Sequence, residues 1–276
     1  MQYNIAVIGG GPGGYVAAIY AARSKAKVAL IEKDEIGGTC LNKGCIPTKA
    51  LIQSAHIYDL IKKAKRFGVN AENVNINWEA MQQHKNTIVA NLTKSVETLL
   101  KVNGVDIYKG KAKLIDSNTI NIISEVGEKS IRAEIIILAT GSYPATIPIP
   151  GHDLEGVITS DEALSLPEVP QSMLIVGGGV IGIEIGYIYK TLGTEVTIVE
   201  IMPQILPRHD EEIARDLREV LQNIGIRIYT DAKIKSIEKI SNHLKTTYET
   251  KQGIESVTTQ KVLMSVGRKP VIDAFE

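Results

Sequence analysis

The sequence of 276 residues lacks the features that mark several classes of protein. It has no uncharged apolar run of the roughly 18 residues that a membrane-spanning helix needs. Its first residues carry no basic segment, and glycines from Gly9 to Gly14 interrupt the first apolar stretch, which argues against a secretory signal. Basic and acidic residues both number 31, so charge does not force a nucleic-acid-binding surface. We therefore expect a soluble, cytoplasmic protein with no membrane or nucleic-acid partner.

Cysteine and histidine are also scarce. The two cysteines are too few for a disulfide scaffold. The five histidines are scattered and no C-x-x-C pair occurs, so the sequence predicts no metal site. The remaining composition, 44% hydrophobic and 22% charged, is that of an ordinary globular protein, and the length favours two domains of roughly 100–200 residues each.

The chain contains an internal repeat. Residues 5–32 align without a gap with residues 173–200, at an offset of 168 positions (177 − 9). Each copy has a short apolar strand, the pattern G-x-G-x-x-G, a helix-length stretch, and a second apolar strand that ends in glutamate. This order is typical of the start of a βαβ unit that binds a dinucleotide.

The three glycines of each copy have different predicted tasks. The first allows a tight turn, the second lets the backbone approach a pyrophosphate, and the third lets helix and strand pack closely. The helix that follows presents N–H groups and its positive dipole end to the phosphates. The glycines are Gly9, Gly11 and Gly14 in the first copy and Gly177, Gly179 and Gly182 in the second.

A carboxylate ends each copy. Glu32 and Glu200 lie about 20 residues past the glycines, where a carboxylate accepts hydrogen bonds from ribose hydroxyls. Either one would repel the 2′-phosphate of NADP. Arg208 could meet such a phosphate, but one basic residue that faces a carboxylate makes a poor NADP site, so we expect NAD.

Both cysteines fall in one glycine-rich segment after the first copy. Residues 37–49 read GGTCLNKGCIPTK, with Cys40 and Cys45 five positions apart. A regular helix holds such residues too far apart for a disulfide, whose Cα atoms lie within about 7 Å, but Gly44 and Pro47 could distort the turn. Two buried structural thiols are the alternative. Since no secretory signal is evident, we expect a redox-active disulfide rather than a structural one.

The cysteine segment and the two G-x-G-x-x-G patterns, called fingerprints below, together resemble the pyridine nucleotide–disulfide oxidoreductases. The pattern G-G-T-C-x-N-x-G-C-I-P-T-K carries the resemblance, which covers essentially the whole chain. Within the family the chain is most similar to the branch that oxidises dihydrolipoyl groups. Val180 supports this branch, because the glutathione-reducing branch usually has a tyrosine there. The resemblance implies an α/β fold with two Rossmann-like dinucleotide-binding domains, for FAD and NAD, the second inserted in the first.

The resemblance also implies a division of the chain. We expect an incomplete FAD-binding domain at residues 1–143, an NAD-binding domain at residues 144–264, and a return segment toward the FAD domain at residues 265–276. Three prolines within residues 143–150 mark the first boundary. The family's later FAD-domain strand and its C-terminal interface domain, which supplies a His–Glu acid/base pair, are not visible. The chain is therefore expected to be the front portion of a longer enzyme.

Amphipathic stretches predict helices at residues 50–66, 77–102 and 210–224, with Asn77 as a cap of the second.

The resemblance assigns catalytic roles to four residues. Cys40 would be the interchange thiol that attacks the substrate, and Cys45 would be the thiol nearest the flavin, which forms the charge-transfer thiolate. Lys49 resembles the lysine that contacts flavin N5, and Glu184 resembles its ion-pair partner, since a cation near N5 stabilises the reduced flavin. The residues alone would favour an exposed lysine and a helix-surface glutamate.

The resemblance further implies a set of nucleotide contacts. On the FAD side they are the first three fingerprint glycines with Glu32, Lys33, Gly38, Thr39, Cys40, Lys49, Ala112, Thr140, Gly141 and Ser142. On the NAD side they are the second three glycines with Val180, Ile181, Glu184, Glu200, Ile234 and Gly267. Without the resemblance, residues 139–142 would be a plain turn at the end of a strand.

These assignments imply an enzyme that oxidises dihydrolipoyl groups. Electrons would pass from the dithiol to the Cys40–Cys45 disulfide, then to FAD, and then as hydride to NAD+. The implied partners are the dihydrolipoyl domains of 2-oxo-acid dehydrogenase complexes, and the longer parent would be a homodimer. The alternatives are another NADH-linked flavin disulfide reductase of the family, such as a small-disulfide or mercuric reductase, and a catalytically silent nucleotide-binding fragment. We expect the 276-residue chain to be inactive alone.

Overall fold

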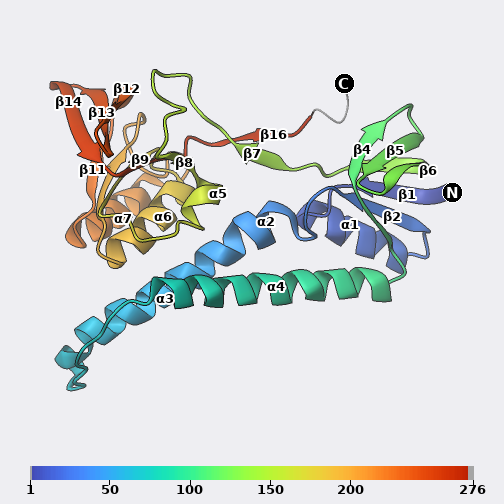
Figure 1. The fold of residues 1–276 in the computed structure, drawn as a ribbon, viewed down its shortest axis with the longest axis horizontal. Helices are drawn as coiled ribbons and strands as arrows, with labels where there is room; N and C mark the ends of the chain where they lie inside the picture. The colour runs from blue at the N-terminus through green and yellow to red at the C-terminus, as the bar shows by residue number, and fades with distance from the viewer. Residues whose placement is uncertain (1, 273–276) are drawn as a thin grey trace. The chain divides into compact units, whose positions relative to one another are not determined.

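The computed structural model describes residues 2–272, which form two compact units (Figure 1). Within that range the first unit comprises residues 2–47, 86–143 and 269–272, and the second comprises residues 48–85 and 144–268. Two long helices, α3 (Cys45–Lys63) and α4 (Trp78–Val102), each include residues of both units. The short strands β7 (Ser142–Pro144) and β16 (Arg268–Pro270) pair with each other.

The first unit is built on a six-stranded sheet in the order β3-β2-β1-β6-β5-β4. Strands β1, β2, β3 and β6 are parallel, and β4 and β5 are antiparallel to their neighbours. The elements are β1 (Gln2–Ile8), α1 (Pro12–Arg23), β2 (Val28–Glu32), α2 (Gly38–Lys43), β3 (Asp106–Lys109), β4 (Lys111–Leu114), β5 (Thr119–Ser124) and β6 (Gly127–Leu138). Every residue of β2 is buried, as expected for a parallel strand covered on both faces.

Two hydrophobic clusters cover the two faces of this sheet. Val7 and Leu30 pack with Ala18 of α1 and Leu100 of α4. Their neighbours along the strands, such as Ala29, point the other way and pack with residues of β4 to β6. This alternation is the two-residue period of a β-strand, and it fixes the register of β1 and β2.

The second unit contains a five-stranded parallel sheet in the order β11-β10-β9-β15-β8 and a three-stranded antiparallel sheet, β12-β13-β14. Its elements are η1 (Ala64–Phe67), β8 (Val157–Thr159), α5 (Ser160–Ala163), β9 (Ser172–Val176), α6 (Val180–Thr191), β10 (Glu195–Val199), α7 (Glu211–Asn223), β11 (Arg227–Tyr229), β12 (Lys233–Ile240), β13 (His243–Thr250), β14 (Gly253–Thr259) and β15 (Lys261–Met264). In β9, Met173 and Ile175 pack with residues of helices α5 to α7, whereas Leu174 and Val176 pack with residues of the three-stranded sheet.

The compact units differ from the expected division in two respects, of which the smaller is that residues 265–268, expected in the return segment, belong to the second unit. Residues 48–85, which the sequence placed in the first domain, belong to the second unit. Leu51 and Ala55 of α3 form a buried cluster with Leu164, with Ile188 of α6 and with Leu192, the C-cap of that helix. Burial of this apolar surface explains the grouping, because it removes the exposed stripe of α3 from water.

The predicted helices are present, with boundaries that differ from the predicted ones by up to five residues. Helix α3 begins at Cys45, five residues before the predicted start (50 − 45), because Gly44 ends the preceding helix and allows a new one to begin. Asn77 caps α4 as predicted: its Oδ1 accepts a hydrogen bond from the Ala80 N–H at 3.0 Å.

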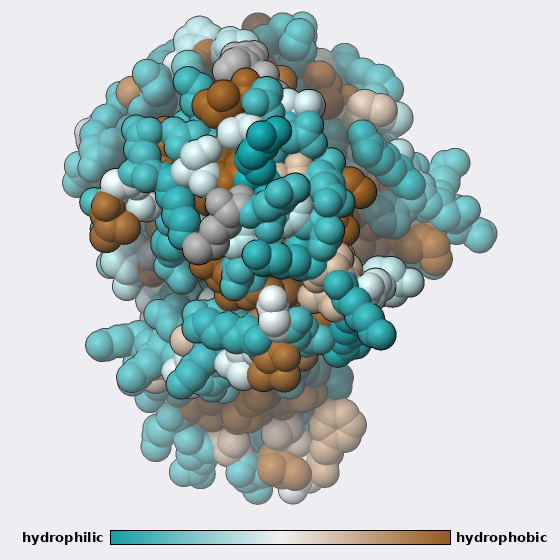
Figure 2. All heavy atoms as spheres, turned by 90° about the vertical axis from the view of Figure 1, so that its right-hand side faces the viewer, coloured by the Kyte–Doolittle hydropathy of each residue, from teal (hydrophilic) through white to brown (hydrophobic). Residues whose placement is uncertain are grey.

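Hydrophilic side chains predominate on the face shown in Figure 2, and hydrophobic side chains are interspersed among them. Between residues 2 and 272, no helix combines the length and apolar character that a membrane crossing requires.

Candidate functional site

The first and third glycines of each fingerprint are required by the protein's own backbone. Gly9 has a φ of +107° and Gly177 has a φ of +103°. A Cβ at Gly9 would lie 2.1 Å from the Ala139 carbonyl oxygen, and a Cβ at Gly182 would lie 2.3 Å from the Gly177 carbonyl oxygen. These glycines therefore serve the turn and the close packing of strand and helix, as the sequence predicts.

The middle glycines border space that no described part of the chain fills. The described atom nearest to a Cβ added at Gly11 is 3.8 Å away, and none lies within 4 Å at Gly179. Gly11 and Gly179 are the N-caps of α1 and α6, and within the described chain neither helix has a side-chain cap hydrogen bond or an acidic residue in its first turn. Each helix therefore presents N–H groups and the positive dipole end to a space that an anionic group fits.

The two terminal carboxylates are held in the same way. Glu32 and Glu200 are 9% and 6% exposed, respectively. Their hydrogen bonds come from Gly10 N and Asp34 N to Glu32, at 2.6 and 2.8 Å, and from Gly178 N and Met202 N to Glu200, at 2.6 and 2.8 Å. A carboxylate has about four lone-pair sites, so each side chain can accept further bonds while it stays anchored to its glycine loop.

The predicted adenine-side positions are equivalent in the two units. Gly110 N donates to the carbonyl oxygen of Glu32 at 2.8 Å, and Ala232 N donates to that of Glu200 at 3.0 Å. Ala112 and Ile234 follow two residues later, and both are buried. Ala112 and Ile234 thus have the same position relative to the glutamate of their unit. Their contact with adenine stays a prediction.

Residues at the end of β6 hold the return segment. Thr140 Oγ1 donates to the Val271 carbonyl at 2.6 Å, and Val271 N donates to the Gly141 carbonyl at 3.0 Å. Ser142 begins β7. In the second unit, the Gly267 carbonyl accepts a hydrogen bond from Ala145 N at 2.9 Å. The Thr140 hydroxyl therefore donates its hydrogen bond within the protein, and the backbone of Thr140 remains available to a cofactor.

The first glycine loop is directly bonded to the segment that carries the cysteines. Gly37 N donates to the Gly10 carbonyl at 2.8 Å, and a Cβ on Gly38 would lie 2.7 Å from the Cα of Gly11. Gly38 begins α2, which contains Thr39 and Cys40. The structure thus brings together the fingerprint and the cysteine segment, which the sequence predicted to be neighbours.

The break between the two cysteines lies at Gly44. Its φ of −145° and ψ of −114° end α2, and Cys45 is the first residue of α3. Cys40 is half-buried and Cys45 is exposed. Pro47 lies in the first turn of α3. Backbone N–H groups there have no partner within the helix, so the missing N–H of proline costs no helical hydrogen bond. The redox-active disulfide between the two cysteines stays a prediction.

The predicted ion pair between Lys49 and Glu184 is present. Lys49 Nζ lies 2.5 Å from Glu184 Oε1, and the two side chains are 58% and 26% exposed. Lys49 is one helical turn after Cys45, and Glu184 is in the second turn of α6. An ion pair this exposed contributes about 0–1 kcal/mol to stability, so the fold depends little on it. Its contact with flavin N5 stays a prediction.

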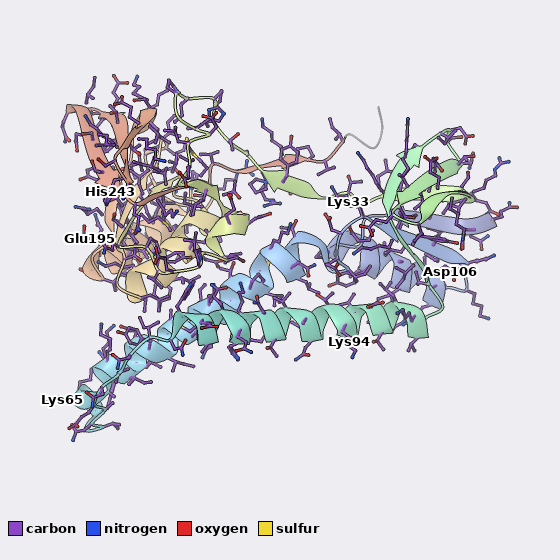
Figure 3. All side chains as sticks on the ribbon, viewed as in Figure 1. Lys33, Lys65, Lys94, Asp106, Glu195 and His243 are labelled. Atoms are coloured by element: carbon purple, nitrogen blue, oxygen red, sulfur yellow. The ribbon has the colours of Figure 1, made fainter. Side chains whose placement is uncertain are left out.

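The remaining predicted residues surround these loops. Lys33 follows β2 and its side chain is exposed (Figure 3). Val180 is exposed in the first turn of α6, whereas Ile181 packs against the hydrophobic core of the second unit. Of the two, Val180 has the side chain that a ligand at the helix end could contact.

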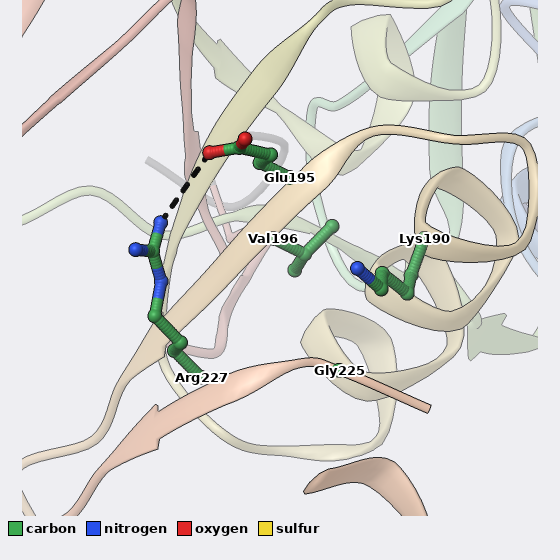
Figure 4. Close-up of a pocket in the computed structure, with 5 residues that line it drawn as sticks. All are labelled: Lys190, Glu195, Val196, Gly225 and Arg227. Atoms are coloured by element: carbon green, nitrogen blue, oxygen red, sulfur yellow. Dashed lines mark ion pairs between the residues drawn. The ribbon is translucent and has the colours of Figure 1, made fainter. Parts of the chain in front are cut away.

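A surface cavity of about 260 Å³ lies elsewhere in the second unit (Figure 4). It is lined by Lys190, Glu195, Val196, Gly225 and Arg227, and Arg227 Nη2 lies 3.7 Å from Glu195 Oε2. This cavity is at the amino ends of β10 and β11, whereas the glycine loops are at the carboxyl ends of their strands. It contains none of the predicted site residues.

Sequence reasoning missed several residues that build the loops. Leu206 N donates to the Gly178 carbonyl at 2.8 Å, the counterpart of the bond from Gly37 to Gly10. The repeat's offset of 168 positions relates Gly37 to position 205, which is one residue before Leu206. Asn42 donates to the carbonyls of Glu35, Ile36 and Gly38, and its position between the two cysteines was the available indication.

Comparisons with known proteins agree with this geometry. The family model described as pyridine nucleotide-disulphide oxidoreductase matches residues 3–276. A dihydrolipoyl dehydrogenase of Bacillus subtilis is 38% identical over 99% of this chain and 60% of its own length. One of Acholeplasma laidlawii is 41% identical over 97% of this chain and 79% of its own length.

Solved structures show the same likeness. The HOCl-induced flavoprotein disulfide reductase RclA from Escherichia coli superposes with a TM-score of 0.83 at 29% identity, over 99% of this chain and 58% of that one. The chain spans about 60% of the length of the curated relatives it first matches. The parallel sheets, the paired glycine loops and the matched family model together show that the chain belongs to the pyridine nucleotide-disulphide oxidoreductases.

Proposed function

We propose that this protein oxidises dihydrolipoyl groups and transfers hydride to NAD+, with FAD and a Cys40–Cys45 disulfide as the intermediate carriers. The observation that carries the proposal is the bond between the first glycine loop and the cysteine segment, from Gly37 N to the Gly10 carbonyl. Relatives named dihydrolipoyl dehydrogenase, 38–41% identical to this chain, support the choice of substrate.

The first unit fits FAD. The open space at Gly11 and the N-terminus of α1 would take the pyrophosphate, and the anchored carboxylate of Glu32 would accept from the adenosine ribose. Gly38, packed against Gly11, keeps the start of α2 close to this space. When bound, FAD accepts two electrons from a dithiol and passes them on as hydride.

The second unit fits NAD by the same reasoning. Gly179 and the N-terminus of α6 would take the pyrophosphate, and Glu200 the adenosine ribose. The Glu200 carboxylate is buried and anchored by two N–H groups, so it cannot move aside for a 2′-phosphate. This supports NAD over NADP.

The thiol chemistry rests on residues of the chain itself. One sulfur of the substrate dithiol attacks Cys40 and breaks the Cys40–Cys45 bond, and the second substrate sulfur then displaces Cys40 and closes the substrate disulfide. Two electrons thereby move to the cysteine pair. Lys49, held by Glu184, provides a fixed positive charge one turn from Cys45.

We further propose that the partners are dihydrolipoyl domains of 2-oxo-acid dehydrogenase complexes, that the working enzyme is a homodimer, and that it acts in the cytoplasm. The names of the curated relatives support the first part of this proposal. A second candidate function, reduction of another disulfide at the expense of NADH, is supported by the likeness to a flavoprotein disulfide reductase.

Absorption and turnover measurements test the proposal. The purified protein should carry flavin absorption, and addition of dihydrolipoamide should produce a long-wavelength band. Because we expect the 276-residue chain to be inactive alone, turnover is measured in the longer enzyme of which it is expected to be the front portion; there we expect turnover of dihydrolipoamide with NAD+ and little with glutathione and NADPH. Cys40→Ser should retain the flavin and abolish turnover. Undiminished turnover by this variant would refute the proposed disulfide, and NADH-dependent reduction of a different disulfide would favour the second candidate.

A further inference from the structure

Asn42 lies between the two cysteines and forms hydrogen bonds in two directions. Its Nδ2 donates to the carbonyls of Glu35, Ile36 and Gly38, at 3.4, 3.1 and 3.0 Å. Its Oδ1 accepts from Thr93 Oγ1 of α4 at 3.2 Å. One half-buried side chain therefore connects α2, the loop that precedes it, and α4, all within the first unit.

These bonds close α2 on its own entry loop. Helix α2 has six residues and, in the described chain, no side-chain cap at Gly37. Isolated helices shorter than roughly 12–15 residues are marginal in water, so α2 depends on contacts from outside its own backbone. Thr93 fixes the amide of Asn42, because a hydroxyl that donates to Oδ1 leaves Nδ2 facing the carbonyls.

The loop to which Asn42 is bonded is itself immobilised. Gly37 N donates to the Gly10 carbonyl at 2.8 Å. Lys109 Nζ lies 2.8 Å from Glu35 Oε1 and also donates to the Asp34 carbonyl. Asn42 thus attaches the helix that carries the first cysteine to a loop that is already fixed to the glycine loop.

The other end of α2 is a backbone turn at Gly44. Gly44 separates α2 from α3, and glycine has the greatest conformational freedom of any residue. A rotation at Gly44 would carry Cys40 away from Cys45. The bonds of Asn42 oppose such a rotation, because they attach α2 to its entry loop and to α4.

We propose that Asn42, oriented by Thr93, is a positioning residue for the thiol–disulfide step: it keeps Cys40 within reach of Cys45 and so stabilises the disulfide between them. This inference rests on the proposed function in that it takes Cys40 and Cys45 as the redox pair. When the Asn42 bonds hold α2 in place, the effective concentration of the Cys40 thiol at Cys45 is high, which favours the disulfide. Loss of these bonds lowers that concentration.

The test measures the disulfide equilibrium without turnover. The protein is equilibrated with mixtures of reduced and oxidised dithiothreitol, and the free thiols are alkylated and counted by mass spectrometry. One dithiothreitol sulfur attacks the Cys40–Cys45 bond and releases one cysteine thiol; the second sulfur then releases the other and closes the dithiothreitol ring. Two electrons pass from dithiothreitol to the cysteine pair.

Asn42→Ala is expected to shift the equilibrium constant toward the reduced form by about tenfold, which equals about 30 mV for a two-electron couple. Thr93→Val should shift it in the same direction by a smaller factor, because the amide remains but loses its fixed orientation. Thr98→Val is the matched control: the Thr98 hydroxyl donates to the Lys94 carbonyl of its own helix at 2.8 Å, so no shift is expected.

The outcomes separate the two proposals. If the unmodified protein forms no Cys40–Cys45 disulfide in any mixture, the proposed function fails. If it forms the disulfide but Asn42→Ala and Thr93→Val leave its equilibrium constant unchanged, the positioning role is refuted. An equal shift in Thr98→Val would also refute it. Should Asn42→Ala fail to fold by circular dichroism, Thr93→Val decides the question.

Discussion

Gly179→Ala should weaken NAD binding strongly while leaving the fold nearly intact. No described atom lies within 4 Å of the methyl group that this change adds. The new side chain therefore causes no collision, and replacement of glycine by alanine at an N-cap costs up to about 1 kcal/mol. The expected decrease in melting temperature is about 2–4 °C for a unit of this size.

The expected loss of affinity follows from contact distances. A phosphate oxygen that accepts an N–H bond does so at about 2.9 Å, whereas an oxygen and a methyl carbon keep about 3.5–4 Å apart. A methyl at Gly179 would push the phosphate outward and lengthen the bonds at the start of α6 beyond useful distance. Loss of two such charge-assisted bonds, at about 1.5 kcal/mol each, corresponds to roughly a hundredfold weaker binding.

Gly182→Ala is the contrasting variant. Its Cβ would lie 2.3 Å from the Gly177 carbonyl oxygen, so the backbone must move, at a cost of about 3 kcal/mol. Calorimetric titration with NAD+ and thermal unfolding should therefore separate the two variants. Gly179→Ala with undiminished affinity for NAD+ would show that the open space at this helix end does not take the pyrophosphate. Equal destabilisation by both changes would show that the space is not open.

Three further predictions concern the chemistry and the stability of the protein. Lys49→Met and Glu184→Gln should each change the free energy of unfolding by less than about 1 kcal/mol, because the pair is exposed, yet lower dihydrolipoamide turnover of the longer enzyme several-fold in steady-state assays. Thr246→Val should stabilise the protein by about 1 kcal/mol in urea unfolding, since the Thr246 hydroxyl is buried without a hydrogen-bond partner in the described chain. Burial lowers the pKa of Lys85, so the unfolded state binds more protons than the folded state as the pH approaches 10.5. The stability of the unmodified protein relative to Lys85→Met should therefore rise with pH in that range; a constant difference would contradict this linkage.

The repeat, the glycines and the terminal acids could be predicted from the sequence because each depends on local chain geometry. A positive φ at Gly9 and Gly177, and a close approach at Gly14 and Gly182, are properties of a strand, a turn and a helix that follow one another directly. The pairing of Lys49 with Glu184, which are 135 positions apart, was reached through family resemblance and confirmed by the structure.

Only the tertiary structure decided the contacts between distant segments. The sequence predicts that Glu32 and Glu200 contact a ribose, but only the fold shows that each accepts an N–H from its own glycine loop. Residues 48–85 belong to the second unit because apolar side chains among them pack against α6. No local sequence pattern predicts this packing. Thr93 of α4 is hydrogen-bonded to Asn42 of α2 although the two residues are 51 positions apart in the sequence, because the fold brings these helices together. Periodicity and turn chemistry act over a few residues, whereas these contacts depend on where packing brings whole elements together.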